Sequence, residues 1–280
     1  FDIIFFWVAR MIMMTTHFIS EVPFKKIFIH GLVKDSEGQK MSKSKGNILD
    51  PLDIIDGIST EALIKKRTEG LLQPKMKEKI EKQTIKEFPE GIQSHGTDAL
   101  RLTYCSLASG SRDVNFDMKR VEGYRNFCNK LWNAARFIKL QLADNDGPGG
   151  RESKDSPDLW IKEKLNETSQ KVNSYFEEFR FDLVTLTIYD FIWNEFCDWY
   201  IEICKIRLSS KAYGVKEKRA ILQSLISTLE KSLRLAHPIM PFITEELWQQ
   251  FRPEHKTKSL SIMISEYPIG KNKKASKEYS

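Results

Sequence analysis

The sequence predicts an α/β fold over residues 1–119 followed by an all-α fold over residues 120–280. In the first part, helix-like and strand-like stretches alternate, which is typical of a parallel sheet with crossover helices. In the second part, apolar residues recur every three or four positions, which is the period of helices packed in a bundle. The stretch at about 144–157 (DNDGPGGRESKDSP) has the composition of a linker.

The elements of the first part follow from local patterns. The apolar run 2–14 indicates a buried helix, and Lys26–Val33 indicates a short strand followed by a polar loop. The next helix is expected to have Asp50 as its N-cap, Pro51 in its first turn and Gly57 at its C-terminal end. Residues 63–93 are rich in Lys and Glu, which indicates a solvated connecting helix or loop.

The second part is predicted to begin with one long helix. Its apolar stripe consists of Val121, Tyr124, Cys128, Leu131, Ala135, Ile138 and Leu142. Further helices are expected near 158–180, 182–209 and 216–236. A break at His237-Pro238 precedes a last helix that runs through Phe251.

Composition narrows the class of protein. The 280 residues carry a net charge of +6, which weakly favours an anionic partner such as a nucleotide or nucleic acid. The richest apolar stretch is interrupted by Arg10, so no membrane span is expected. None of the four cysteines forms a Cys-x-x-Cys pair, so we expect reduced thiols in a cytoplasmic protein, and not a zinc site.

The most informative stretch is Lys40-Met41-Ser42-Lys43-Ser44, in the loop between a predicted strand and a predicted helix. Loops at the carboxyl edge of a parallel sheet are where α/β proteins bind nucleotides. Mobile ammonium groups and hydroxyl donors suit a polyphosphate, whose charge builds up as the α-phosphorus is attacked. An ordinary basic surface loop is the alternative, but this pentapeptide is expected by chance in about one chain of this length in ten thousand.

These five residues match the KMSKS signature loop of the class I aminoacyl-tRNA synthetases, which this chain resembles. Members of that family activate an amino acid with ATP, release pyrophosphate and esterify the 3′ end of a tRNA. The resemblance implies that Lys40 and Lys43 are catalytic and stabilise the departing pyrophosphate. It implies Mg2+ accompanying ATP, without a metal held by the protein itself. The implied ATP-binding residues are Lys40, Met41, Ser42, Lys43, Ser44 and Gly31.

Longer stretches narrow the resemblance to the valyl-tRNA synthetase family, and they occur in the order that family shows. Isoleucyl- and leucyl-tRNA synthetases share the layout, but the isoleucyl enzymes typically have a Gly-Trp-Phe sequence where this chain has Phe6-Trp7-Val8. The similar stretches are 1–14, 30–59, 88–101, 111–117, 123–137, 193–202 and 236–249.

The resemblance also implies an architecture and further site residues. Residues 1–119 would be the C-terminal half of a Rossmann-like catalytic domain, and residues 120–280 a helical anticodon-binding domain. Trp7 and Asp2 would line the amino-acid pocket. The implied partners are valine, ATP and tRNA(Val), and the protein would be a cytoplasmic monomer. The implied tRNA-binding residues, on the first long helix, are Arg125, Asn129, Lys130 and Asn133.

Two departures from the family pattern leave alternatives open. The HIGH motif and the editing domain are absent from this sequence, and Phe1 is not an initiator Met, so we expect a fragment that does not complete catalysis alone. A tRNA-binding module without catalytic activity is one alternative. A synthetase of the isoleucyl or leucyl type is another.

Overall fold

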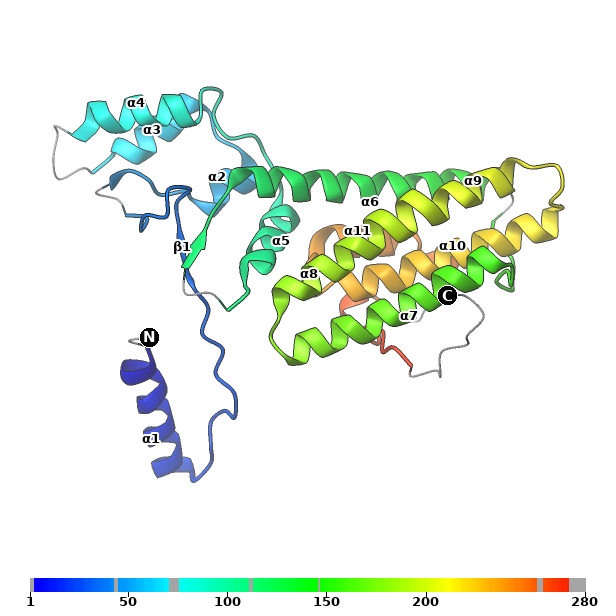
Figure 1. Cartoon of the computed structure of the whole chain (residues 1–280), viewed down its shortest axis with the longest axis horizontal. Helices are drawn as coiled ribbons and strands as arrows, with labels where there is room; N and C mark the ends of the chain where they lie inside the picture. The colour runs from blue at the N-terminus through cyan, green and yellow to red at the C-terminus, as the bar shows by residue number, and fades with distance from the viewer. Residues whose placement is uncertain are drawn as a thin grey trace.

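The structure, a computed structural model, describes residues 3–42, 45–70, 76–110, 113–145, 147–255 and 259–271. Figure 1 shows a small α/β region formed by the first part of the chain and a bundle of long helices formed by the rest. The long helix α6 (Met118–Asp144) begins beside the α/β region and runs along the bundle. The predicted order, α/β followed by all-α, is confirmed.

The first helix differs from the expected buried helix. It begins with the π-helical segment η1 (Ile4–Val8) and continues as α1 (Ala9–Ile19), and neither contains a buried residue. Figure 1 shows α1 apart from the other elements, at the end of an extended segment. The prediction of burial was wrong because an apolar helix is buried only where a second layer covers it, and the described residues supply none.

A two-stranded parallel sheet forms the centre of the α/β region. β1 (Leu32–Lys34) pairs with β2 (Asp113–Asn115), with Val33 opposite Val114. The strand predicted at Lys26–Val33 is therefore shorter and begins later than expected. Pairing in a sheet needs a neighbouring strand, and β2 offers only three residues for β1 to bond with.

The helix after the loop is built as its sequence predicts. The Asp50 carboxylate accepts a hydrogen bond of 3.0 Å from the N–H of Leu52, which caps α2 (Pro51–Asp56). Gly57 ends the helix with a φ of 84°, a conformation that only glycine adopts without strain. Asp50 and Gly57 thus define the two ends of α2, which directly follows the KMSKS loop.

The stretch predicted to be a solvated connector forms a helical hairpin, followed by one more helix. α3 (Thr60–Thr68) packs on α4 (Lys77–Glu87), and each helix buries a few side chains under a charged outer surface. α5 (Thr97–Leu107), which was not predicted from the sequence, packs on both α2 and α6.

The bundle follows the predicted helices to within about one helical turn. All seven residues of the predicted stripe on α6 are buried or half-buried, and Phe127 joins them. The helices from residue 181 to 209 form one continuous rod whose middle segment is π-helical. After α6 come α7 (Ser156–Glu177), α8 (Phe181–Asp190), η4 (Phe191–Tyr200), α9 (Ile201–Ser209), α10 (Val215–Ala236), α11 (Pro241–Gln250), α12 (Arg252–His255) and the short η5 (Ile262–Ile264).

α5 joins the α/β region to the bundle at the corner between α10 and α11. The Asp98 carboxylate accepts hydrogen bonds from the N–H groups of Phe242 and Ile243, in the first turn of α11, at 3.3 and 2.6 Å. The Arg101 guanidinium donates to the carbonyls of Pro238 and Ile239 at 3.0 and 3.2 Å. Backbone groups left unpaired at the ends of these helices are thereby satisfied by α5.

Among the described residues, no helix is both long enough and apolar enough to cross a membrane.

Candidate functional site

The KMSKS loop leaves the sheet at the carboxyl end of β1. Directly after β1 the chain makes a tight turn, in which the N–H of Gly38 donates to the carbonyl of Asp35 at 3.0 Å and Gly38 has a φ of 76°. Asp is favoured at the first position of such a turn, and Gly is favoured where the backbone needs a positive φ. Lys40 then forms an antiparallel bridge to Lys34, which keeps the start of the motif beside the sheet.

Two side chains connect the start of the loop to its end. Asp35 Oδ1 accepts a hydrogen bond of 2.6 Å from the N–H of Gln39, and Asp35 Oδ2 accepts one of 2.8 Å from the Asn47 amide. Asn47 Oδ1 in turn accepts a bond of 2.9 Å from the N–H of Ser42. Neither Asp35 nor Asn47 was predicted from the sequence, although an Asp and an Asn that flank a motif are residues suited to such backbone contacts.

The ionised form of Asp35 is the one that organises the loop. Burial raises the pKa of this carboxyl, but the hydrogen bonds from Asn47, Gln39 and Glu37 and the charge of Lys45 outweigh that effect, so its pKa lies below the ordinary value. A carboxylate that accepts several hydrogen bonds is stabilised in its charged form. Asp35 is therefore a structural anion at neutral pH.

The described residues of the motif differ in their surroundings. Lys40 is exposed, and within the described residues its ammonium group has no hydrogen bond or ion pair. Met41 is half-buried and packs against an apolar cluster formed by Ile54, Ala99, Leu100, Phe116 and Val121. Ser42 is half-buried with its N–H bonded to Asn47. Residues Lys43 and Ser44 lie outside the described residues.

The remaining predicted residues of the nucleotide and amino-acid sites lie nearer the N-terminus. Gly31 directly precedes β1 and is half-buried. Trp7 lies in η1 and is 60% exposed. Since α1, which continues η1, is set apart from the loop in Figure 1, the structure does not bring Trp7 together with the KMSKS loop. Asp2 lies outside the described residues.

The four predicted tRNA-binding residues all lie on α6, in two kinds of surroundings. Asn129 and Asn133 are exposed, and their spacing of four places them on the same face of the helix. Arg125 donates to the side chain of Gln93 at 3.3 Å.

Lys130 has partners on η4, the neighbouring helical segment of the bundle. Its ammonium group forms an ion pair with Asp198 and lies 3.8 Å from the centre of the Trp193 ring. Both contacts hold α6 against η4, so Lys130 has a structural task that the two asparagines do not have.

A pocket of about 530 Å³ lies beside the end of the loop. Its charged residues are partly paired, since the Lys66 ammonium bonds to Asp50 at 2.6 Å and to Asp53 at 2.8 Å. The residues that line it are Gly46, Ile48, Leu49, Asp50, Pro51, Asp53, Leu63, Lys66, Arg67 and Glu69.

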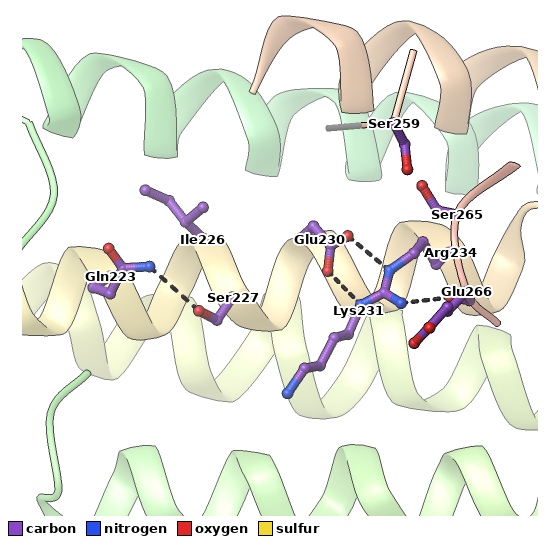
Figure 2. Close-up of a pocket in the computed structure, with 9 residues that line it drawn as sticks. All are labelled: Gln223, Ile226, Ser227, Glu230, Lys231, Arg234, Ser259, Ser265 and Glu266. Atoms are coloured by element: carbon purple, nitrogen blue, oxygen red, sulfur yellow. Dashed lines mark hydrogen bonds and ion pairs between the residues drawn. The ribbon is translucent and has the colours of Figure 1, made fainter. Parts of the chain in front are cut away.

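A second pocket, of about 440 Å³, lies on the bundle between α10 and the C-terminal segment around η5. Figure 2 shows Arg234 and Glu230 pointing toward one another, whereas Lys231 points away from them. Arg234 forms an ion pair with Glu230 at 2.7 Å and donates to the carbonyl of Glu266. These contacts hold the C-terminal segment on α10, so the charged side chains that make them stabilise the fold.

Among the described residues, no three His, Cys, Asp or Glu side chains gather in a way that could hold a metal ion. All four cysteines are free thiols. Burial raises the pKa of Cys128, Cys197 and Cys204 to about 12, which keeps these thiols protonated and unreactive at neutral pH.

Two family models match the chain, one over each region. Residues 1–117, which hold the sheet and the loop, match the model of class I tRNA synthetases (I, L, M and V). Residues 158–280, which hold the bundle from α7 onward, match the model of the anticodon-binding domain of tRNA ligase.

Several curated relatives are similar to nearly the whole chain. The valine–tRNA ligase of Acinetobacter baylyi is 54% identical over 96% of the chain, and that of Psychrobacter arcticus is 51% identical over 99% of it. The valine–tRNA ligase of Legionella pneumophila is 54% identical over 96% of the chain. The chain spans only 28–30% of the length of these relatives.

Among solved structures, the chain is similar to the LeuRS of Agrobacterium radiobacter K84, crystallised in a ternary complex with tRNA and LeuAMS. The two align with a TM-score of 0.55 and 19% identity, over 89% of this chain and 24% of that one. At this identity the likeness shows the fold. The fold, the two family models and the curated relatives agree: the chain belongs to the class I aminoacyl-tRNA synthetases, in the family of the valine–tRNA ligases.

Proposed function

We propose that this chain carries the ATP loop and the anticodon-binding part of a valine–tRNA ligase, which activates valine with ATP and transfers it to tRNA(Val). The observation that carries the proposal is the KMSKS motif in a loop at the carboxyl end of a parallel strand. There the ammonium group of Lys40 is exposed, and Asp35 and Asn47 fix the two ends of the loop. An exposed lysine ammonium in a loop at this edge of a sheet is suited to bind a triphosphate.

In the proposed adenylation, the valine carboxylate attacks the α-phosphorus of ATP. The bond from that phosphorus to the oxygen bridging the β-phosphorus breaks, and pyrophosphate leaves with the negative charge. Lys40 and Lys43 would stabilise that charge as it develops, and Ser42 and Ser44 would donate hydrogen bonds to the phosphates. Gly31 would let the nucleotide approach the start of β1.

The nucleophile of this reaction is the substrate's own carboxylate, so the protein needs no activated serine or cysteine. Mg2+ would enter with ATP, bound by its phosphates, and supply further charge stabilisation.

The remaining assignments of the proposal concern valine and tRNA. Trp7 and Asp2 would contribute to the valine pocket. For tRNA, exposed Asn129 and Asn133 offer donors and acceptors to phosphates and base edges. Arg125 and Lys130 belong to the same proposed surface but also bond to Gln93 and Asp198. We further propose that the catalytic part ends near residue 119, that the anticodon-binding part follows it, and that the protein is a cytoplasmic monomer.

The test is amino-acid-dependent ATP–pyrophosphate exchange. It uses this chain alone and a chimera in which the chain replaces the matching stretch of the Acinetobacter baylyi ligase, the 54% identical relative. We expect exchange with valine in the chimera and none in the chain alone. Exchange that depends on isoleucine or leucine would replace the valine assignment. A folded chimera that binds tRNA(Val) without any exchange would favour a tRNA-binding module.

A further inference from the structure

The α3–α4 hairpin contacts the KMSKS loop, and the reaction proposed above gives it no role. It follows α2 in the chain and, as Figure 1 shows, lies at the outer end of the α/β region, beside the connection from β1 to α2. Two of its side chains, Ile80 and Lys66, reach the segment between the motif and α2.

The first contact lies two residues after the motif. Gly46 is buried and has a φ of 65°, and a Cβ placed on it would lie only 2.7 Å from Cδ1 and Cγ2 of Ile80. Ile80, on α4, is itself 3% exposed, so its side chain has little room to move away. The branched side chain of Ile80 therefore fills the space directly against the backbone at the end of the loop.

The second contact lies at the start of α2. The Lys66 ammonium, on α3, bonds to the carboxylates of Asp50 and Asp53, and Asp50 is the residue that caps α2. Between the two contacts, Leu49 packs against the apolar cluster of Leu63, Phe88 and Ile92, of which Leu63 lies on α3. The loop's exit is thus held against the hairpin by Ile80, Leu63 and Lys66.

The hairpin is held together by a buried cation. Arg67, on α3, has a side chain that is 4% exposed and donates to Thr84 at 3.2 Å and to Glu87 at 3.4 Å, both on α4. Its guanidinium also lies 5.2 Å from the centre of the Phe88 ring. α3 and α4 therefore act as one body, and Ile80 is held in place by the packing of the whole hairpin.

We infer that the α3–α4 hairpin is a positioning element for adenylation, with Ile80 as the positioning residue that fixes the exit of the KMSKS loop. This inference rests on the proposed function, because it assigns Ile80 an effect on the lysines of the motif and no contact with substrate. A shift of about 1 Å in a catalytic group is enough to lower a rate by about 10²-fold. Loss of the Ile80 contact should therefore slow the reaction without weakening valine binding.

The first test uses the chain alone and measures the rate of tryptic cleavage after Lys40 or Lys45. Ile80→Ala should raise this rate several-fold, and Ile80→Val, which keeps the branched carbon, should restore most of the protection. Ile85→Ala is the matched control, because Ile85 lies on the same helix but is 50% exposed. Equal cleavage rates for Ile80→Ala and Ile85→Ala would contradict the proposal that the Ile80 contact fixes the loop.

The second test measures valine-dependent exchange in the chimera. Ile80→Ala should lower kcat about tenfold with the KM for valine unchanged, which is the pattern of a group that acts in the transition state. Gly46→Ala should also lower kcat, and adding Ile80→Ala to it should recover part of the loss, because the clash is then relieved. A chimera without exchange would refute the proposed function. Normal exchange with an unchanged kcat in Ile80→Ala would overturn this inference alone.

Discussion

Lys34 and Lys40, which bridge each other at the start of the loop, differ in the partners of their ammonium groups. The Lys34 ammonium is paired with Asp113 at 3.0 Å across the sheet, whereas the exposed Lys40 ammonium has no partner within the described residues. A lysine without a partner can bind a phosphate without first breaking an ion pair. The two residues are therefore a test site and its control for the role of charge near the loop.

Replacing a motif lysine should affect the rate of adenylation and not the binding of valine. In the chimera, Lys43→Ala should lower the kcat of ATP–pyrophosphate exchange by about 10²-fold, the usual effect of removing one transition-state donor, and Lys40→Ala should act in the same direction. Lys34→Ala removes the same charge from the sheet and should leave kcat within about twofold. An unchanged kcat in Lys43→Ala would contradict the role assigned to this residue.

His237 should make the stability of the bundle depend on pH. Burial lowers the pKa of this imidazole below 6.5, an effect that outweighs the charges of Glu245 and Asp98, and its Nδ1 lies 2.8 Å from Thr244 Oγ1. The unfolded chain therefore takes up a proton at a higher pH than the folded chain. The free energy of unfolding must then fall as the pH decreases from 6.5 through the folded pKa.

The measurement is urea unfolding at pH 7.5 and at pH values below 6.5, for the natural chain and for His237→Gln. The natural chain should lose more stability on acidification than the variant, because the variant lacks the titrating group. Parallel losses in the two proteins would show that His237 does not contribute.

α5 is the helix on which the contact between the α/β region and the bundle depends. Burial raises the pKa of Asp98, and the hydrogen bonds from Ile243 and Phe242 oppose that shift. Asp98→Ala would leave the first N–H groups of α11 without their acceptor, so the free energy of unfolding should fall by about 1–3 kcal/mol. Asp144→Ala, at the exposed end of α6, is the control and should change it by less than about 0.5 kcal/mol. Equal urea midpoints for the two variants would argue against this contact.

The helices differed in how well local patterns predicted them. The stripe on α6 repeats from Val121 to Leu142, so its period is clear and all its predicted residues are buried or half-buried, although Phe127 and Ala134 were missed. α3 and α4 were missed as a packed hairpin because each buries only two residues, among them Arg67 and Thr84, which a hydrophobic pattern does not mark. β1 was placed too early because strand pairing depends on a partner that lies 81 positions further along the chain, as Val33 opposite Val114 shows.

The α/β region and the bundle share residues of α6, so we expect them to behave as one body. Val121 belongs to the apolar cluster that includes Ile54 and Phe116, Leu131 and Ile138 belong to the large cluster of the bundle, and Tyr124 packs against both. A tRNA bound along α6 would thus rest on the same helix that starts beside the loop. The two proposed tasks, adenylation and tRNA binding, should nevertheless respond to different substitutions.

Replacing the exposed asparagines of α6 should weaken tRNA binding alone. In the chimera, Asn129→Ala combined with Asn133→Ala should lower the affinity for tRNA(Val) several-fold, since each lost hydrogen bond contributes about 0.5–1.5 kcal/mol, and valine-dependent exchange should be unchanged. Asn194→Ala, at an exposed position on η4, is the control. Lys130→Ala is less suitable, because it also breaks the ion pair with Asp198. Reduced exchange with normal tRNA affinity would refute this division.

The sequence by itself determined the order of the two regions, the helices of the bundle and the position of the KMSKS motif. Each of these depends on residues close together in the chain: helical periods, helix caps such as Asp50, and a contiguous pentapeptide. Only the tertiary structure decided that Asp35 and Asn47 hold the loop, that Ile80 packs on Gly46 and that Asp98 caps α11. The physical reason is that these contacts join residues that are 12 to 145 positions apart in the chain, and their geometry exists only once the helices have packed.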